Sequence, residues 1–389
     1  MSSTLKNFRV NNSSNSLISF QKTVDLLKGK TDNPTVGNCS NIRCLKQGNS
    51  VRIKWTDPND LIIDNVTLAS WSKTTLVRKT GNYPTSPTDG VVVITSTVRN
   101  QYNNTAYIDT IPDSEVTYYY QLFPWSETNT VNEQHSNRFE TSSLNWNTVH
   151  GIVQSGQAQD YFEVGDVLTT NHSEYGDIQW QIVAFDQADT VDSSIQHSIT
   201  LLSLNCLSTR VFDSPESSEA PNYRNQFGYN KWSESNIRQW LNSNGSANNW
   251  FVPQNEYDLC SYSNIDGFMR GFTDSSFLNC LTTVKNITAK NIITDQGGYE
   301  ITEDTFFLPS RAEVFGSDNG GIIEGIYWSE IFSDQNSRIK YINNSAVYWW
   351  LRSPRINDTN FSYAVHTTEG NLVSRVDSDC GLVPACVIS

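Results

Sequence analysis

The sequence has little of what usually identifies an enzyme or a membrane protein. No apolar run is long enough to span a bilayer, and the five histidines have no mutual spacing that suggests a metal site or an acid–base pair. No Cys-x-x-Cys pair occurs among the seven cysteines, which are Cys39, Cys44, Cys206, Cys260, Cys280, Cys380 and Cys386. We therefore expect no metal, no cofactor and no membrane contact. Cys380 and Cys386 are the one candidate pair for a bridge, but we interpret all seven as free, buried thiols.

Basic residues are also scarce. Lys and Arg number 27 against 41 Asp and Glu, and the net charge of −14 argues against nucleic-acid binding, which depends on neutralising phosphates. The charge is uneven, since residues 1–46 carry 7 basic and 2 acidic side chains whereas residues 144–389 carry 13 and 29. The basic start is typical either of an arm that docks on an acidic neighbour or of a solvated tail. Residues 1–10 lack an apolar core, so we expect no signal peptide and synthesis in a cytoplasm.

Aromatic residues are abundant, with 11 Trp and 12% aromatic content in a chain of 389 residues. This supplies ample material for cores, and the length predicts two or three domains. We expect residues 1–46 to form an attachment arm. Within it, Phe20, Val24 and Leu27 have helical spacing and Gly29 follows them, which predicts a short helix near residues 19–28.

Residues 47–143 have the pattern of a small β-sandwich. Val51, Ile53 and Trp55 alternate with basic residues, and further short strands are predicted at residues 74–78, 91–95, 106–109 and 117–123. Trp55 in an early strand, and the run from Ile111 to Phe123, resemble a fibronectin type III domain. The resemblance implies that Tyr118 is the tyrosine of a tyrosine corner. No Arg-Gly-Asp triplet is present, so we expect a spacer or docking module.

Residues 144–389 have the pattern of an α+β domain. Strands are predicted at residues 161–168, 178–184 and 199–204, then a helix capped by Ser233 and a second helix with a capping box at Ser310. Near the end, Trp349-Trp350 place indoles on opposite faces of a strand that Pro354 ends. A strand at residues 363–366, a tight turn at Gly370-Asn371 and a closing strand at residues 381–388 follow. We expect a sheet assembled from both ends of the segment.

Four motifs in this segment occur in a characteristic order. They are Trp232-Ser233-Glu234-Ser235-Asn236-Ile237-Arg238-Gln239-Trp240-Leu241-Asn242, Phe307-Leu308-Pro309-Ser310-Arg311-Ala312-Glu313, Trp349-Trp350-Leu351-Arg352-Ser353-Pro354 and Gly381-Leu382-Val383-Pro384-Ala385. The set resembles a family of domains from phage virion proteins and bacterial surface proteins, related to the C-type-lectin-like fold and to formylglycine-generating enzymes. One residue departs from the family pattern, because Val383 stands where an arginine usually precedes the proline. The fold class that follows is multidomain: an all-β fibronectin III-like sandwich, then an α+β C-type-lectin-like domain.

The resemblance implies that ligand contacts come from loops near the final strands, here residues 356–361 and 374–379. Aromatic rings and planar polar groups suit sugars. The candidate ligand-binding residues that supply them are Tyr348, Arg355, Asn357, Asp358, Asn360, Phe361, Tyr363 and Arg375. The residues that we assign to the structural core are Trp55, Tyr118, Trp232, Trp240, Trp349, Trp350 and Arg352. No catalytic set accompanies them.

Three hypotheses follow. The first is a non-enzymatic phage virion protein of the tail tip, baseplate or fibre, homo-oligomeric in the particle. Residues 1–143 contact other virion proteins, and residues 144–389 bind a host cell-surface glycan, protein or wall component. The second is a purely structural virion component, such as a baseplate, collar or capsid-decorating protein. The third is an enzyme, oxidase-like or cell-wall hydrolysing, for which the sequence supplies no catalytic residues.

Overall fold

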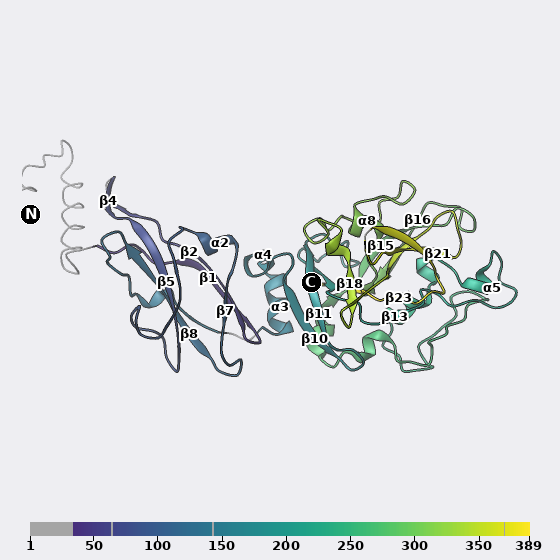
Figure 1. Ribbon diagram of the computed structural model, residues 1–389, viewed down its shortest axis with the longest axis horizontal. Helices are drawn as coiled ribbons and strands as arrows, with labels where there is room; N and C mark the ends of the chain where they lie inside the picture. Colours follow the sequence, from purple (N-terminus) through teal and green to yellow (C-terminus); the bar gives the residue numbers. More distant parts are fainter. Residues whose placement is uncertain (1–33, 64, 142–143, 369) are drawn as a thin grey trace, which may run out of the picture. The chain divides into compact units, whose positions relative to one another are not determined.

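The computed structural model describes residues 34–63, 65–141, 144–368 and 370–389. The chain divides into two compact units, Met1–Leu144 and Asn145–Ser389, whereas the sequence placed this boundary after residue 143. Strands make up 36% of the structure and helices 15%, so the protein is β-rich and multidomain (Figure 1). None of the helices in the described ranges combines the length and the apolar character needed to traverse a bilayer. The helix predicted near residues 19–28 lies outside the described residues.

The first unit is built on a three-stranded sheet, in the order β1-β2-β7, and a four-stranded sheet, in the order β6-β5-β8-β9. The elements of the first sheet and the small β3–β4 hairpin are β1 (Ser40–Gln47), β2 (Ser50–Thr56), β7 (Tyr107–Thr110), β3 (Leu61–Ile63) and β4 (Val66–Ala69). The remaining elements are β5 (Trp71–Thr80), β6 (Val91–Ser96), β8 (Tyr118–Ser126), β9 (Arg138–Glu140), α2 (Gln101–Asn104) and the 3₁₀ turn η2 (His135–Asn137). All pairings within these sheets are antiparallel.

The alternation read in the sequence explains the core of this unit. Val51, Ile53 and Trp55 of β2 are buried and pack with Leu76 and Tyr120 of the other sheet, which removes both inner faces from water. The indole of Trp55 donates to the buried Asp57 carboxylate at 2.9 Å. Strands were predicted correctly at each of the five expected places.

Two expectations for this unit need correction. Residues 40–46 were assigned to the attachment arm, but they form most of β1, which pairs with β2 and belongs to the sheet. Tyr118 is buried as expected, but the tyrosine hydroxyl that joins the two sheets belongs to Tyr120. It donates to Asp109 of β7 at 2.7 Å. The Tyr118 ring instead lies under the Arg78 guanidinium. The two tyrosines are two residues apart in one strand, so sequence spacing alone does not separate their roles.

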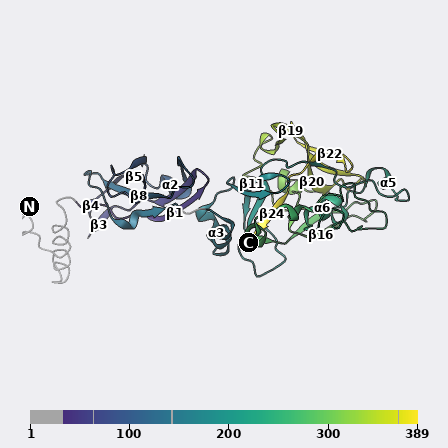
Figure 2. The same ribbon diagram turned by 90° about the horizontal axis from the view of Figure 1, so that it is seen from below.

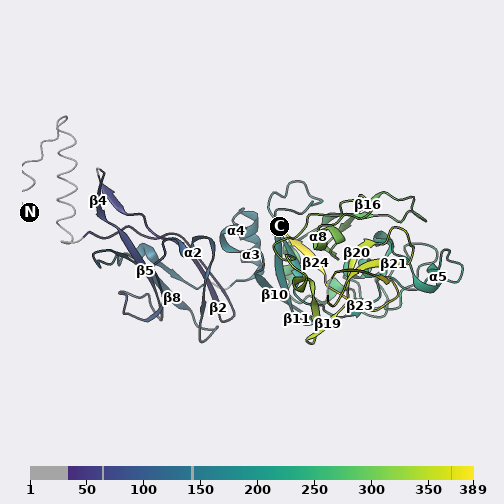
Figure 3. The same ribbon diagram turned by 45° about the horizontal axis from the view of Figure 1, so that its top comes forward.

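The second unit contains a six-stranded sheet in which strands from both ends of the unit meet, as the sequence predicted. Its main path runs β10-β11-β12-β24-β14, and β17 also pairs with β24. Figure 3 shows the yellow end of the chain, β24, entering this sheet beside the teal strands. The bounds are β10 (Val167–His172), β11 (Gly176–Phe185), β12 (Ile199–Ser203), β14 (Leu281–Thr282), β17 (Phe306–Phe307) and β24 (Ala385–Ile388).

A second sheet of this unit, in the order β13-β23-β20-β21-β22, carries the Trp349–Pro354 motif. Its strands are β13 (Thr209–Arg210), β20 (Trp349–Pro354), β21 (Phe361–Val365), β22 (Asn371–Arg375) and β23 (Cys380–Gly381). Two hairpins complete the strands, namely β15 (Val284–Ala289) with β16 (Tyr299–Asp304) and β18 (Lys340–Ile342) with β19 (Ser345–Val347). The predicted closing strand at residues 381–388 is therefore wrong, because β23 and β24 lie in different sheets and Pro384 separates them.

Helices in the second unit are short. They are α3 (Trp146–Gln154), α4 (Ala158–Tyr161), α5 (Arg224–Phe227), α6 (Asn236–Leu241), α7 (Ser275–Cys280) and α8 (Arg311–Phe315), with the 3₁₀ turns η3 (Trp232–Glu234), η4 (Phe268–Gly271) and η5 (Asn336–Arg338). The capping box at Ser310 is present, and Gly316 ends α8 with φ 65°. The predicted cap at Ser233 is wrong: Ser235 caps α6, and Ser233 instead donates its hydroxyl to Glu300 at 2.6 Å. The strand predicted from residue 161 begins only at Val167, and α3 and α4 precede it.

Candidate functional site

The strand β20 belongs to the interior of the second unit. Trp349 and Trp350 are fully buried, and their indoles donate in different directions, to the carbonyls of Arg338 and Arg210. Arg352 is 1% exposed, and its guanidinium forms a two-pronged ion pair with Glu313 at 2.7 and 3.0 Å. These residues hold the two sheets and helix α8 together. Their burial makes this strand part of the core, and the chain reaches the surface again after Pro354, at Arg355.

The loop that follows β20 is fixed from inside by two asparagine amides. Asn230 is fully buried, and its side-chain amide donates to the carbonyls of Asp358 at 2.6 Å and Phe361 at 2.7 Å. The amide of Asn291 also donates to the Asp358 carbonyl. A buried amide that satisfies loop carbonyls holds the backbone in one conformation. The loop is therefore an ordered surface.

Most of the candidate ligand-binding residues meet on this loop. Arg355 and Asp358 form an exposed ion pair at 2.9 Å, and the Arg355 guanidinium lies 6.0 Å from the centre of the Phe361 ring. Phe361 is paired in register with Arg375 across β21 and β22. Asn357 lies exposed on the same loop. These five residues thus form one mixed aromatic and polar patch.

The other candidates lie apart from this patch. Asn360 is buried, and so it cannot reach a ligand directly. Tyr363 lies further along β21, with the Arg311 guanidinium 4.9 Å from its ring centre. Tyr348 lies at the opposite end of β20, where its ring contacts His366. The predicted residues therefore do not form one site, because Tyr348 and the patch lie at opposite ends of β20.

The sequence reading missed the residues next to the patch. Asn222 and Tyr223 both have left-handed backbone conformations, with φ of 55° and 64°, directly before α5. A tyrosine in this conformation is strained, and the other non-glycine residues with positive φ in the described ranges are Asn, Asp and one Gln. The Tyr223 side chain is nevertheless 66% exposed. A backbone conformation that tyrosine disfavours thus coincides with an exposed aromatic ring.

Contacts join this segment to the patch. The Thr359 hydroxyl donates to the Asn222 carbonyl at 2.7 Å, and the Arg375 guanidinium lies over the Phe227 ring at 4.4 Å. Helix α5 lies at the end of the second unit opposite to β10 and β11 (Figures 1 and 2). We call the group of Asn222, Tyr223, Phe227, Arg355, Asn357, Asp358, Phe361 and Arg375 the α5 surface. No spacing rule in the sequence connects its two halves, because 125 or more residues separate the hydrogen-bonded partners.

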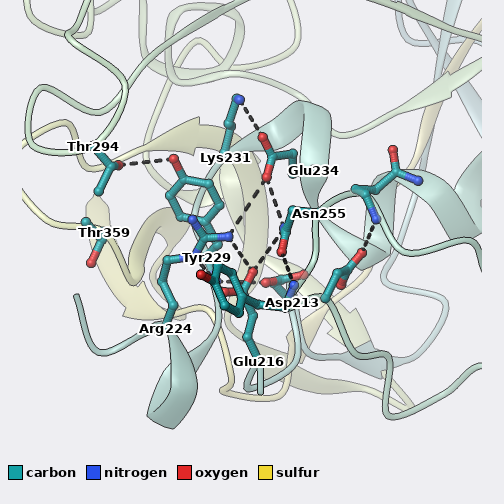
Figure 4. A network of polar contacts seen from close by, with 12 residues as sticks. Asp213, Glu216, Arg224, Tyr229, Lys231, Glu234, Asn255, Thr294 and Thr359 are labelled. Atoms are coloured by element: carbon teal, nitrogen blue, oxygen red, sulfur yellow. Dashed lines mark hydrogen bonds and ion pairs between the residues drawn. The ribbon is translucent and has the colours of Figure 1, made fainter. Parts of the chain in front are cut away.

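A buried polar network lies next to the α5 surface and includes the first residue of α5, Arg224 (Figure 4). The Arg224 guanidinium donates to both oxygens of Glu216, at 2.7 and 2.6 Å, and lies 3.7 Å from the centre of the Tyr229 ring. Glu234 accepts a hydrogen bond from Lys231 at 2.5 Å. Because Arg224 is the first residue of α5 and Tyr229 follows the helix, these bonds fix the segment that carries Tyr223.

Two carboxyl groups of the same network are deeply buried. Asp213 accepts the backbone N–H groups of Tyr229 at 2.7 Å and Asn236 at 3.1 Å, and the Asn236 amide donates to Asp258 at 2.8 Å. Burial raises the pKa of Asp213 well above its usual range and also raises the pKa of Asp258. Among the residues that the structure describes, no group of three or more His, Cys, Asp or Glu side chains is arranged to hold a metal ion. The hydrogen bonds of Asp213 join the chain after α5 to the start of α6.

The seven cysteines are all free, as the sequence predicted, but only five are buried, because Cys44 and Cys260 are partly exposed. Cys380 lies in β23 and Cys386 in β24, in separate sheets. Burial raises the pKa of the Cys380 thiol to about 11 and raises that of the Cys386 thiol well above its usual range. Both side chains remain protonated at neutral pH, and a thiol is a much weaker nucleophile than a thiolate. The α5 surface presents aromatic rings, side-chain amides and the guanidinium groups of Arg355 and Arg375.

Comparison with known proteins adds a family match for part of this unit. The model of a domain of unknown function (DUF6273) matches residues 197–389. The matched range begins just before β12 and includes every residue of the α5 surface, but not α3, α4, β10 or β11. No curated protein and no solved structure matches the chain.

Proposed function

We propose that this chain is a non-enzymatic phage virion protein of the tail tip, baseplate or fibre, and that its second unit binds a glycan or wall component on the host cell surface. The first unit serves as a fibronectin III-like spacer that contacts other virion proteins, and the second unit is C-type-lectin-like. Supporting the first assignment is the facing pair of three- and four-stranded antiparallel sheets. Supporting the second is the loop between β20 and β21, which two asparagine amides hold from inside.

One observation carries the binding proposal. The strained and exposed Tyr223 lies on a segment that buried ion pairs and amides fix in place. Strain that the surrounding structure maintains at an exposed aromatic residue indicates a functional constraint. A fixed ring with neighbouring amides and a guanidinium suits a saccharide, because sugar C–H groups pack on the ring while planar groups bond to the hydroxyls. Homo-oligomeric display in the particle would add the avidity that weak single contacts need.

The test uses the labelled full-length chain with purified bacterial cell walls and a bacterial polysaccharide array. We expect retention by at least one surface preparation, and a drop of tenfold or more in Tyr223→Ala. Tyr341→Ala is the matched control, because Tyr341 is 42% exposed in β18 and lies outside the α5 surface. Failure of every preparation to retain the wild-type chain, or equal losses in the two variants, would contradict the proposal.

A second candidate function, a purely structural virion component, has one observation in its favour. Exposed apolar side chains gather near the β15–β16 hairpin, including Tyr299, Ile301 and Ile323. Exposed apolar patches are typical of protein–protein contact surfaces. Antibody labelling of intact particles separates the two functions. A structural role predicts that epitopes at Ile301 and Tyr223 are both masked, whereas receptor binding predicts that Tyr223 remains accessible.

A further inference from the structure

The two arginines of the α5 surface are both paired with carboxylates that lie close by in the sequence. The Arg355 guanidinium lies 2.9 Å from the Asp358 carboxylate. The guanidinium of Arg375 donates to both oxygens of Asp377, at 3.0 and 3.3 Å. Each positive charge on this surface is thus already compensated by an acidic partner.

The neighbouring cations of the polar network are compensated as well (Figure 4). Arg224 donates to both oxygens of Glu216. Lys231 lies 2.5 Å from Glu234. Acidic side chains are also in excess over the whole second unit, since residues 144–389 carry 13 basic and 29 acidic ones. A phosphate or carboxylate on the α5 surface would therefore meet an acidic residue beside each guanidinium, and like charges repel at short range.

An exposed ion pair presents hydrogen-bond donors and acceptors side by side. The Arg355 side chain is 45% exposed and that of Asp358 is 35% exposed, so both remain accessible while they are paired. A sugar hydroxyl both donates and accepts a hydrogen bond, so two neighbouring hydroxyls match the guanidinium and the carboxylate at once. An ionised acidic group only accepts, and it leaves the carboxylate without a donor. The pair therefore fits hydroxyls better than acidic groups.

The remaining side chains of the α5 surface are uncharged. Three are aromatic: Tyr223 is 66% exposed, and Phe227 and Phe361 are half-buried. Asn222 and Asn357 are exposed and add side-chain amides. Aromatic faces pack against sugar C–H groups, and amides, like hydroxyls, both donate and accept hydrogen bonds. These groups recognise the ring and the hydroxyls of a sugar and do not require a charge on it.

We propose that the α5 surface binds a non-acidic glycan, in which the recognised segment carries hydroxyl or acetamido groups but no phosphate or carboxylate. The inference rests on the proposed function and names the class of glycan. The Arg355–Asp358 pair binds neighbouring hydroxyls, and the Arg375–Asp377 pair offers a second contact of the same kind. The receptor then lies among the non-acidic polysaccharides of the host surface and not among its acidic polymers.

The experiment uses the labelled full-length chain and the wall preparation or array polymer that retains it most tightly. Polygalacturonate and poly(glycerol phosphate) serve as soluble acidic competitors, and neither should displace the chain. Retention should change less than about twofold between about 50 and 500 mM NaCl, because the ligand forms no ion pair with the protein. Displacement by an acidic polymer, or a larger fall with salt, would contradict the proposal.

An isosteric variant gives a sharper test, because the two ligand classes predict opposite signs. Asp358→Asn frees Arg355 from its partner, so an acidic ligand should bind more tightly. A non-acidic glycan instead loses a charged acceptor, and retention should weaken about two- to fivefold. Glu303→Gln is the matched control, because it removes one negative charge from the same unit at an exposed position of β16, outside the α5 surface.

Asp377→Asn repeats the comparison at Arg375, with the same sign expected. Both arginines lie at the surface, so we expect both variants to fold, and thermal unfolding checks this. The proposal is overturned if either variant is retained as tightly as Glu303→Gln or more tightly. If no preparation retains the wild-type chain, the proposed function is wrong and this inference falls with it. Retention of the wild type together with tighter binding of Asp358→Asn refutes the inference alone.

Discussion

Arg352 and Arg355 lie three residues apart on either side of Pro354 but in opposite environments. Arg352 is 1% exposed and is paired with Glu313 inside the unit, while the Arg355 side chain is 45% exposed and is paired with Asp358 on the surface. Arg352 donates to groups inside the unit that water does not reach, whereas Arg355 can release Asp358 and bind a ligand instead. Three residues therefore separate an arginine that supports the core from an arginine that lies on the surface.

The largest effect should follow removal of the buried arginine. Arg352→Met leaves Glu313 buried and unpaired, and we expect the second unit to lose about 3–5 kcal/mol of stability. Urea denaturation followed by tryptophan fluorescence measures this loss. The double variant Arg352→Met/Glu313→Gln should recover part of it, because the buried charge is gone. A loss below about 1 kcal/mol in the single variant would show that Arg352 is not the anchor.

Lys340 extends the comparison to a buried cation without an acidic partner. It is 3% exposed and donates to the carbonyls of Ser203 and Leu204, and burial lowers its pKa from the ordinary 10.5 to about 8. Between pH 8 and 10.5 the unfolded chain binds a proton that the folded chain has released. The contribution of this group to stability therefore rises with pH across that window, by about 3 kcal/mol in total.

The check for Lys340 is a comparison with Lys340→Met at pH 7.5 and pH 10.5. Other buried groups titrate in the same range, so the difference between the two proteins is the informative quantity. The free energy of unfolding of the variant, relative to that of the wild type, should be higher at pH 7.5 than at pH 10.5, since only the wild type carries the buried charge. An unchanged difference would mean that Lys340 stays protonated in the fold.

Asn230 allows a test of whether the loop that carries Arg355 is held in one conformation. Asn230→Ala removes the amide that donates to the Asp358 and Phe361 carbonyls, and we expect a loss of about 2 kcal/mol. Amide hydrogen exchange in residues 355–361 should speed up markedly. Asn357→Ala, at an exposed position in the same loop, is the control and should leave exchange in the flanking residues unchanged. Equal protection in both variants would mean that other contacts hold the loop.

Local pattern was enough to predict the scaffold. The alternation through Val51, Ile53 and Trp55 and the capping box at Ser310 each depend on neighbours within a few residues, and the structure confirms them. The prediction of Ser233 as helix cap was wrong because Glu300, far along the chain, binds Ser233, and Ser235 caps α6 instead. Long-range partners of this kind leave no local signal.

The α5 surface was predictable only in part for the same reason. The sequence reading named Arg355, Asn357, Asp358, Phe361 and Arg375, because the family resemblance implied ligand contacts in the loops near the final strands. Tyr223 was missed: its left-handed backbone results from contacts such as the Thr359 hydroxyl on the Asn222 carbonyl, and tyrosine itself does not favour that conformation.

Tyr223 offers a test in which stability and binding move in opposite directions. Glycine tolerates the left-handed conformation, so Tyr223→Gly should keep the fold or stabilise it by up to about 1 kcal/mol. Binding to the surface preparation that retains the wild type should nevertheless fall at least tenfold. Urea denaturation and the retention assay measure the two quantities on the same sample. Destabilisation by more than about 1 kcal/mol would mean that the ring supports the fold, and the strain would then have no functional meaning.

The smallest effect on stability should come from the exposed arginine. Arg355→Ala breaks an ion pair that solvent screens, so we expect a change below about 0.5 kcal/mol, in contrast to Arg352→Met. If the α5 surface contacts a glycan, the same variant should weaken retention several-fold, because a planar donor next to Phe361 is lost. Lys73→Ala is a matched control: Lys73 is a basic residue of the first unit with its amino group over the Trp125 ring. Loss of retention in Arg355→Ala but not in Lys73→Ala would place the contact at residue 355 and exclude a general effect of lowering the positive charge.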